Sequence, residues 1–291
     1  MSTIPASPLS SGTAGPLSGQ CRVPGDKSIS HRALILGSLA VGRTRIDGLL
    51  EGEDVLATAA ALRALGADIA RQADGSWSVN GVGIGGLQEP ELPLDLGNSG
   101  TGTRLLMGVV AGHDLTAFFT GDASLRRRPM ARVTEPLQRM GARIVARSGG
   151  RLPLALTGAS EALPLTYATP VASAQVKSAI LLAGLSAPGE TTVIENLPSR
   201  DHTENLLRHF GGDVTSAPTA EGGRRITLRG QPELVAADLT VPGDPSSAAF
   251  LVAADTLARS VAGANELPIG IVTALIGVPC FVFLLRRPGT R

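Results

Sequence analysis

Residues 23–32, Val-Pro-Gly-Asp-Lys-Ser-Ile-Ser-His-Arg, predict a tight turn that leads directly into a helix. A short strand is expected to end at Val23, and Pro24-Gly25-Asp26 has the composition of a turn. Either of the two serines that follow can cap a helix, with Lys27 and Arg32 beside its first N–H groups. A helix N-terminus flanked by cations favours an anion, most naturally phosphate. A solvated turn with incidental charges is the alternative.

The composition restricts the class of protein. Of 291 residues 43% are hydrophobic but only 3% are aromatic, so an aliphatic core is expected. Lys and Arg number 26 against 25 Asp and Glu, and this balance excludes a global field that recruits nucleic acid or an anionic membrane. Cys21 and Cys280 lack metal or redox spacing, as do His113, His202 and His209. No metal site is predicted, and a reduced cytosol fits the cysteines.

Three glycine-containing helix ends recur at intervals of about 70 residues. They are Leu65-Gly66-Ala67-Asp68-Ile69, Met140-Gly141-Ala142-Arg143-Ile144 and Phe210-Gly211-Gly212-Asp213-Val214. Each follows an amphipathic stretch, and each glycine stands where a helix needs a left-handed residue after its last turn. This recurrence indicates one structural unit used three times.

A returning strand and an earlier helix recur in the same order. The strands are Trp77–Gly81, Leu154–Gly158 and Ile226–Gly230, and the helices begin within Lys27–Leu34, Asn98–Leu105 and Ser173–Ile180. The order predicts an α/β domain of three βαβαββ units around a pseudo-threefold axis. Three polar helix N-termini would then share one side of the domain. Three unrelated surface caps are the alternative.

A fourth unit is expected to begin near residue 241. Val241-Pro242-Gly243-Asp244-Pro245-Ser246-Ser247 resembles the opening motif, and a helix should follow at Ala248. We interpret this segment as a second domain that is only begun. The predicted division is a disordered tail at 1–20, a three-repeat domain at 21–240, the start of the second domain at 241–253, and a hydrophobic helix with a basic tail at 254–291.

The segment from Leu267 to Leu285 carries no charge and precedes Arg286-Arg287. Its length falls within the ~17–25 residues that cross a bilayer, and the two arginines would hold that end in the cytoplasm. Residues 254–287 are similar to the last membrane helix of siderophore- and cobalamin-type ABC importer permeases. Contact with a membrane through this segment is therefore expected. A buried core helix is the alternative.

Further motifs occur in order between residue 21 and about residue 252. They are Val23–Arg32, Gly48–Asp54, Leu96–Arg104, Gly121–Met130, Ala172–Gly184, Arg200–Glu204 and Val241–Ser247. Together they closely resemble the 5-enolpyruvylshikimate-3-phosphate (EPSP) synthase family, particularly its glyphosate-tolerant bacterial forms. The sister family that acts on UDP-N-acetylglucosamine is a poorer match, because Lys27-Ser28 stands where that family has Lys-Asn.

The resemblance implies a fold and an activity. The family has two domains, each of three βαβαββ units, with the site in the cleft between them. Its members transfer the enolpyruvyl group of phosphoenolpyruvate to the 5-hydroxyl of shikimate 3-phosphate and release phosphate, within aromatic amino acid biosynthesis. No metal or organic cofactor takes part, and a cytoplasmic enzyme domain is expected. The sequence leaves the oligomeric state open.

The resemblance also implies roles for individual residues. Lys27 would be the catalytic cation that bridges both substrates. Gly100 and Arg128 would contact phosphoenolpyruvate, and the room beside Gly100 predicts a glyphosate-sensitive pocket. The shikimate 3-phosphate pocket would contain Ser28, Arg32, Ser173, Ala174, Gln175 and Arg200.

The resemblance is expected to end near Val252, before the second-domain acid and base that the chemistry needs. We therefore expect a truncated and inactive chain, and interpret the change near Val252 as a joining artefact or a rearrangement. Two alternatives remain: a non-catalytic shikimate 3-phosphate binding module tethered to a membrane, and a fragment of an importer permease.

Overall fold

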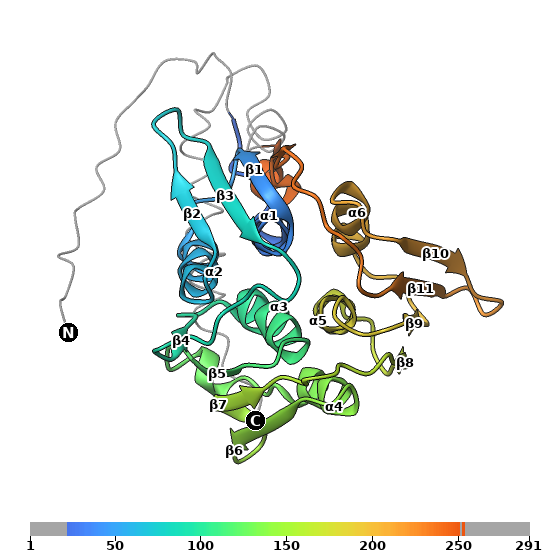
Figure 1. Cartoon of the computed structure of the whole chain (residues 1–291). Helices are drawn as coiled ribbons and strands as arrows, with labels where there is room; N and C mark the ends of the chain where they lie inside the picture. The colour runs from blue at the N-terminus through green and yellow to red at the C-terminus, as the bar shows by residue number, and fades with distance from the viewer. Residues whose placement is uncertain (1–21, 251, 254–291) are drawn as a thin grey trace. The chain divides into compact units, whose positions relative to one another are not determined.

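The computed structural model describes residues 22–250 and 252–253 (Figure 1). Gly25–Pro242 form one compact unit, whereas Pro24 and the residues before it group with Gly243 and the residues after it. The expected tail at 1–20 and the expected hydrophobic helix at Leu267–Leu285 lie outside the described residues. Within the described part of the chain, no helix is both long and apolar enough to cross a membrane.

Three four-stranded sheets with one shared pattern make up the compact unit. Each sheet has a parallel pair at one edge and antiparallel pairs elsewhere. The first has the order β12 (Leu239–Thr240), β1 (Val41–Asp47), β3 (Trp77–Val82) and β2 (Asp68–Arg71). The second has the order β4 (Leu94–Asp95), β5 (Thr116–Thr120), β7 (Arg151–Thr157) and β6 (Arg143–Arg147). The third has the order β8 (Thr166–Thr169), β9 (Glu190–Glu195), β11 (Arg224–Arg229) and β10 (Val214–Pro218).

Two helices accompany each sheet, as Figure 1 shows. The first helices of the units are α1 (Lys27–Leu39), α3 (Gly100–Ala111) and α5 (Ala174–Gly184). The second helices are α2 (Glu53–Ala64), α4 (Ala131–Arg139) and α6 (His202–His209), and a short 3₁₀ turn, η1 (Leu125–Arg127), precedes α4. The predicted α/β class is confirmed. Along the chain, the elements follow the βαβαββ order in the second and third units.

The first unit obtains its leading strand from the far end of the domain. The expected strand ending at Val23 is absent, because residues 22–24 have no strand geometry. Instead β12 lies parallel to β1, with Leu239 opposite Ile46 and Thr240 opposite Asp47. A chain segment that follows the third unit therefore completes the first sheet, and this pairing closes the ring of units.

The three recurring glycines end their helices as predicted. Gly66, Gly141 and Gly211 have φ angles of 101°, 104° and 87°, which an L side chain rarely adopts. The N–H of Gly66 donates to Arg63 O, and the next strand begins two residues later. These turns set the angle at which each second helix returns to its sheet.

The glycines that end the returning strands allow a very close approach. A Cβ at Gly158 would collide with the carbonyl oxygens of Val110 and His113, at the end of α3. Gly81 meets the corresponding carbonyls of α1, and Gly230 those of α5. Each sheet therefore lies directly against the C-terminal end of its own first helix. The N-terminal ends of these helices are left to form the opposite side of the unit.

The first helices are almost entirely buried and form the centre of an aliphatic core. Backbone contact between α3 and α5 is close, because a Cβ at Gly108 would lie 2.6 Å from the Cα of Ala179. Leu34, Leu105 and Leu181 are fully buried in the same core. Close packing of these helices fixes where their first turns lie.

A test of the close approach is the substitution Gly158→Ala. We expect the free energy of unfolding to fall by about 3 kcal/mol, because the new methyl group forces the strand away from α3. Urea denaturation measures this loss. Gly52→Ala is the control, since its Cβ meets only Leu50 carbons at 3.6 Å. Equal losses in the two variants would contradict the proposed packing constraint.

Candidate functional site

Side chains cap all three first helices at the same position of the repeat. Each cap accepts a hydrogen bond from the N–H three residues ahead: Asp26 Oδ1 from Ile29 at 2.8 Å, Ser99 Oγ from Gly102 at 3.1 Å and Ser173 Oγ from Val176 at 3.4 Å. The sequence-based choice of Ser28 or Ser30 as the cap of α1 was therefore wrong. An aspartate outcompetes them because it precedes the helix and has extended backbone angles.

Side-chain hydrogen bonds connect the start of α3 to that of α5, and another joins the start of α1 to the loop before α6. Gln175 of α5 donates from Nε2 to Thr101 Oγ1 of α3 at 3.0 Å, and its Oε1 accepts from Arg104 Nη1 at 3.0 Å. Arg200 Nη1 lies 3.4 Å from Ser28 Oγ on α1. The structure thus places the predicted Gln175 against the second repeat and joins the predicted Ser28 and Arg200 of the first and third repeats.

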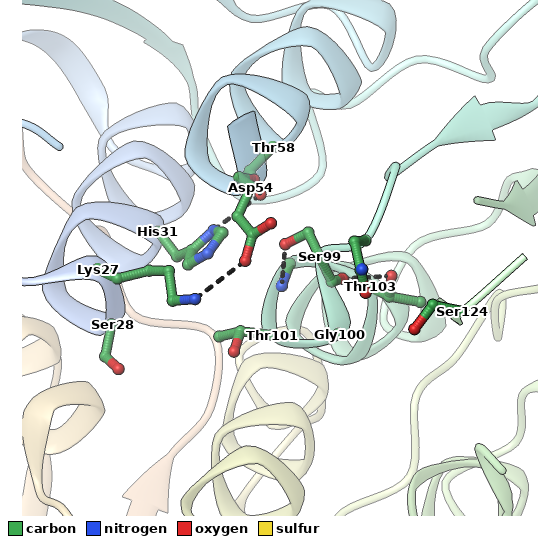
Figure 2. A network of polar contacts seen from close by, with 12 residues as sticks. Lys27, Ser28, His31, Asp54, Thr58, Ser99, Gly100, Thr101, Thr103 and Ser124 are labelled. Carbon is green, nitrogen blue, oxygen red and sulfur yellow. Dashed lines mark hydrogen bonds and ion pairs between the residues drawn. The ribbon is translucent and has the colours of Figure 1, made fainter. Parts of the chain in front are cut away.

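Lys27 lies in the first turn of α1 and forms an ion pair with Asp54 of α2 (Figure 2). The Nζ–Oδ2 distance is 3.1 Å, and the Lys27 side chain is 53% exposed. An ion pair this open to water contributes little stability and is readily exchanged for another anion. Asp54 was missed as a partner because the sequence indicated only a helix start.

Arg32 is buried and links three helices. Its Nε donates to Thr203 Oγ1 at 2.6 Å, its Nη2 to Ser178 Oγ at 2.7 Å and its Nη1 to Ser28 O at 2.8 Å. Burial lowers the pKa of Arg32 to about 10, and the nearby Glu204 carboxylate opposes this effect. Two of its five N–H groups are not used by these bonds. Contact of Arg32 with a ligand stays a prediction.

Two guanidinium groups face Gly100 at the start of α3. A Cβ there would lie 2.9 Å from Arg128 Nη1 and 3.0 Å from Arg104 Nη1. Asn98 Oδ1 accepts from Arg128 Nη2 at 2.5 Å. Burial lowers the pKa of Arg104, and the positive charges of Arg132 and Arg128 lower it further. Like charges gathered at a helix N-terminus create a local preference for an anion.

The remaining predicted residues lie at the start of α5. Ser173 caps this helix, and Ala174 and Gln175 are its first two residues. The first N–H groups of a helix have no partner within it, so they are available to a ligand oxygen. Arg104 was missed although it lies in the same motif as Gly100. The motifs Val23–Arg32 and Leu96–Arg104 both end in an arginine, and this shared ending was the signal that could have found Arg104.

His31 is fully buried. Figure 2 shows its ring beside the Lys27–Asp54 pair. Its Nδ1 lies 2.8 Å from Thr58 Oγ1, and Thr58 itself donates to Asp54 O. Nε2 has no hydrogen-bond partner among the described residues. Burial lowers the pKa of His31 to about 4, with the positive charges of Arg32 and Lys27 acting in the same direction and Asp54 opposing them.

Arg32 and Arg104 are buried cations in the first helices of two units, and Lys27 adds an exposed one at the start of α1. Positive charge near helix N-termini favours a small anion. The chain matches the family EPSP synthase (3-phosphoshikimate 1-carboxyvinyltransferase) over residues 12–274 and belongs to that family. This match passes Val252, where the sequence analysis ended the resemblance, and covers part of the segment assigned to an importer helix. The early end of the resemblance is therefore corrected.

Curated relatives and solved structures agree with this family. The chain is 61% identical over 275 residues to the 3-phosphoshikimate 1-carboxyvinyltransferase of Bradyrhizobium diazoefficiens, covering 92% of the chain and 59% of the relative. It is 65% identical over 252 residues to that of Parvibaculum lavamentivorans, covering 87% and 56%. An EPSP synthase structure from Acinetobacter baumannii matches with a TM-score of 0.75 and 47% identity, covering 81% of this chain and 53% of that one. The chain thus spans a little over half the length of these relatives.

The low pKa of His31 predicts a pH dependence of stability. The neutral ring is favoured in the folded state, so its contribution is present above the unfolded pKa of about 6.5 and is lost as the pH falls towards 4. Across this window the loss amounts to about 3 kcal/mol. The free energy of unfolding, measured by urea denaturation, should fall less steeply in His31→Gln than in the unsubstituted chain. Parallel pH profiles would contradict a buried neutral His31.

Proposed function

We propose that the described unit binds shikimate 3-phosphate at the joined N-termini of α1, α3 and α5, as part of enolpyruvyl transfer from phosphoenolpyruvate. The observation that carries the proposal is the gathering of Lys27, Arg128 and Arg200 at these helix starts. Family membership supports it, since the relatives are named for this carboxyvinyl transfer. The chain spans only part of the length of these relatives.

Shikimate 3-phosphate fits the side of the site near α1 and α5. Ser28 and Arg200 already lie within reach of each other, and together offer a hydroxyl and a guanidinium to a phosphate group. The first backbone N–H groups of α5, at Ala174 and Gln175, add uncharged hydrogen-bond donors for the phosphate. Arg32 would support this group from beneath by holding the Ser28 backbone.

Phosphoenolpyruvate fits the side near α3. Arg128 donates a hydrogen bond to Asn98. Because Gly100 has no side chain, the Arg128 guanidinium can lie close to the start of α3. In the transfer, the 5-hydroxyl oxygen bonds to C2 of phosphoenolpyruvate, and the C2–O bond to phosphate breaks. The hydroxyl proton is lost, and the methylene carbon gains and then loses a proton. Lys27 would serve both substrates as a cation, exchanging Asp54 for substrate oxygens.

The central test is calorimetric titration of the full chain with shikimate 3-phosphate, alongside the variant Lys27→Met. We expect binding by the unsubstituted chain and about tenfold weaker binding by the variant, because a charge-assisted contact is lost. Arg71→Met is a matched control, since Arg71 has the same 53% exposure and pairs with Glu51. Equal affinities in the two variants would contradict the role of Lys27. Phosphate release, measured with both substrates, separates transfer from binding alone.

A second test concerns the space beside Gly100. An added methyl group would press on Arg128 Nη1 and Arg104 Nη1, so these guanidinium groups would have to shift. In a chain joined to the remaining length of the Bradyrhizobium diazoefficiens relative, we expect Gly100→Ala to weaken glyphosate binding by at least about tenfold. Inhibition of phosphate release by glyphosate measures this change. An unchanged inhibition constant would contradict the proposed glyphosate-sensitive geometry.

A further inference from the structure

The third unit contains a buried ion cluster that the proposed function does not use. Lys177 of α5 lies 2.9 Å from Glu195 at the end of β9 and 2.7 Å from Glu204 of α6, measured from Nζ to the carboxylate oxygens. The three side chains are at most 1% exposed. Removing charges from water is expensive, and a buried ion cluster adds little net stability over apolar packing. Stability alone therefore does not explain the cluster.

At two of these three positions, the other two units have uncharged side chains. Four residues after the helix cap, where the third unit has Lys177, the first unit has Ser30 and the second has Thr103. In the second helices, Val55 and Val133 occupy the place of Glu204. The βαβαββ unit forms in all three cases, so its fold does not require the ions. The cluster is a local addition to the third unit.

Glu195 holds the loop that follows β9. Its Oε1 accepts a short hydrogen bond from the Ser199 hydroxyl, and its Oε2 lies 3.4 Å from the Ser199 backbone nitrogen. Residues 196–198 and Arg200 are exposed, whereas Ser199 is partly buried. A single buried carboxylate thus anchors an exposed loop at one residue. Lys177 supplies the counter-charge on the inner side of that carboxylate.

The anchored residue directly precedes Arg200. Arg200 reaches Ser28 of α1 from the exposed loop, with 3.4 Å between Nη1 and Oγ. An arginine on an unanchored loop would lose both backbone and side-chain freedom when it binds a ligand. Fixing the adjacent residue removes part of that loss before binding. An anchor at Ser199 would therefore act on affinity through Arg200.

We propose that Ser199 and Glu195 are positioning residues that aim Arg200 at the phosphate or carboxylate group of the ligand, with Lys177 as the buried counter-charge. The inference rests on the proposed function, because it takes shikimate 3-phosphate as that ligand. In the first unit, Ser30 Oγ accepts from Leu50 N in the loop after β1. Ser30 stands at the helix position that Lys177 has in the third unit. In the first unit this position therefore holds the loop after the equivalent strand by an uncharged hydrogen bond.

The test is calorimetric titration of the full chain and its Ser199→Ala variant with shikimate 3-phosphate. We expect the dissociation constant to rise about fivefold, as for the loss of one positioning hydrogen bond. Ser199→Thr keeps the hydroxyl and should stay within about twofold of the unsubstituted chain. Ser216→Ala is the control, since Ser216 is exposed on β10 of the same unit. Thermal unfolding of each variant reports whether it folds.

A double-mutant cycle with Arg200→Ala separates positioning from general destabilisation. If Ser199 acts through Arg200, Ser199→Ala should have no further effect on affinity once Arg200 is removed. The same fivefold loss in both backgrounds would overturn the inference, as would equal dissociation constants for Ser199→Ala and Ser216→Ala. A chain that does not bind shikimate 3-phosphate in any variant would overturn the proposed function, and the inference with it. If the chain binds shikimate 3-phosphate but the effects of Ser199→Ala and Arg200→Ala are independent, the inference is overturned and the proposed function is not.

Discussion

The close approach of each sheet to the end of its first helix is the constraint on which the rest of the structure depends. Gly81, Gly158 and Gly230 let the returning strands contact helix carbonyl oxygens that a Cβ would displace. This contact fixes the C-terminal ends of α1, α3 and α5 against the sheets. Because the same contact occurs three times, the three N-terminal ends lie together. The candidate site is thus a consequence of how the repeat packs.

Positive charge gathers at the candidate site, and part of it is buried. Arg104 and Arg128 face the same glycine, and burial lowers the pKa values of Arg32 and Arg104. Such an arrangement stores electrostatic free energy that an anion recovers on binding. Lys27 carries an exchangeable charge, because its side chain is exposed and its partner Asp54 is partly exposed. Under the proposed function, the buried cations would shape the site and the exposed cations would contact the ligand.

Local patterns in the sequence predicted much of the fold. The glycines at 66, 141 and 211 marked helix ends because only their backbone freedom fits that position, and alternation marked the strands ending near 81, 158 and 230. The three-unit organisation followed from the spacing of these signals. The leading strand of the first unit was placed wrongly at Val23, since a pairing with Leu239–Thr240 leaves no local signal.

The candidate site was predictable where one motif carried it and unpredictable where distant residues meet. Ser173 and Gly100 were found within their own motifs, and both lie at helix starts as expected. The pairing of Lys27 with Asp54, and the cluster around Lys177, join residues far apart in the sequence. Side-chain type at one position does not reveal such partners. Comparing equivalent positions of the three repeats reveals where one unit departs from the others.

The most direct measurement is a crystal structure of the chain with shikimate 3-phosphate bound. We predict the ligand at the N-termini of α1 and α5, with its charged groups within hydrogen-bonding distance of Ser28, Arg200 and the first N–H groups of α5. A ligand bound at the opposite side of the unit, in the hollow lined by Gly112, His113 and Ser186, would contradict it. That result would mean that the repeats gather their helix starts for a reason other than anion binding.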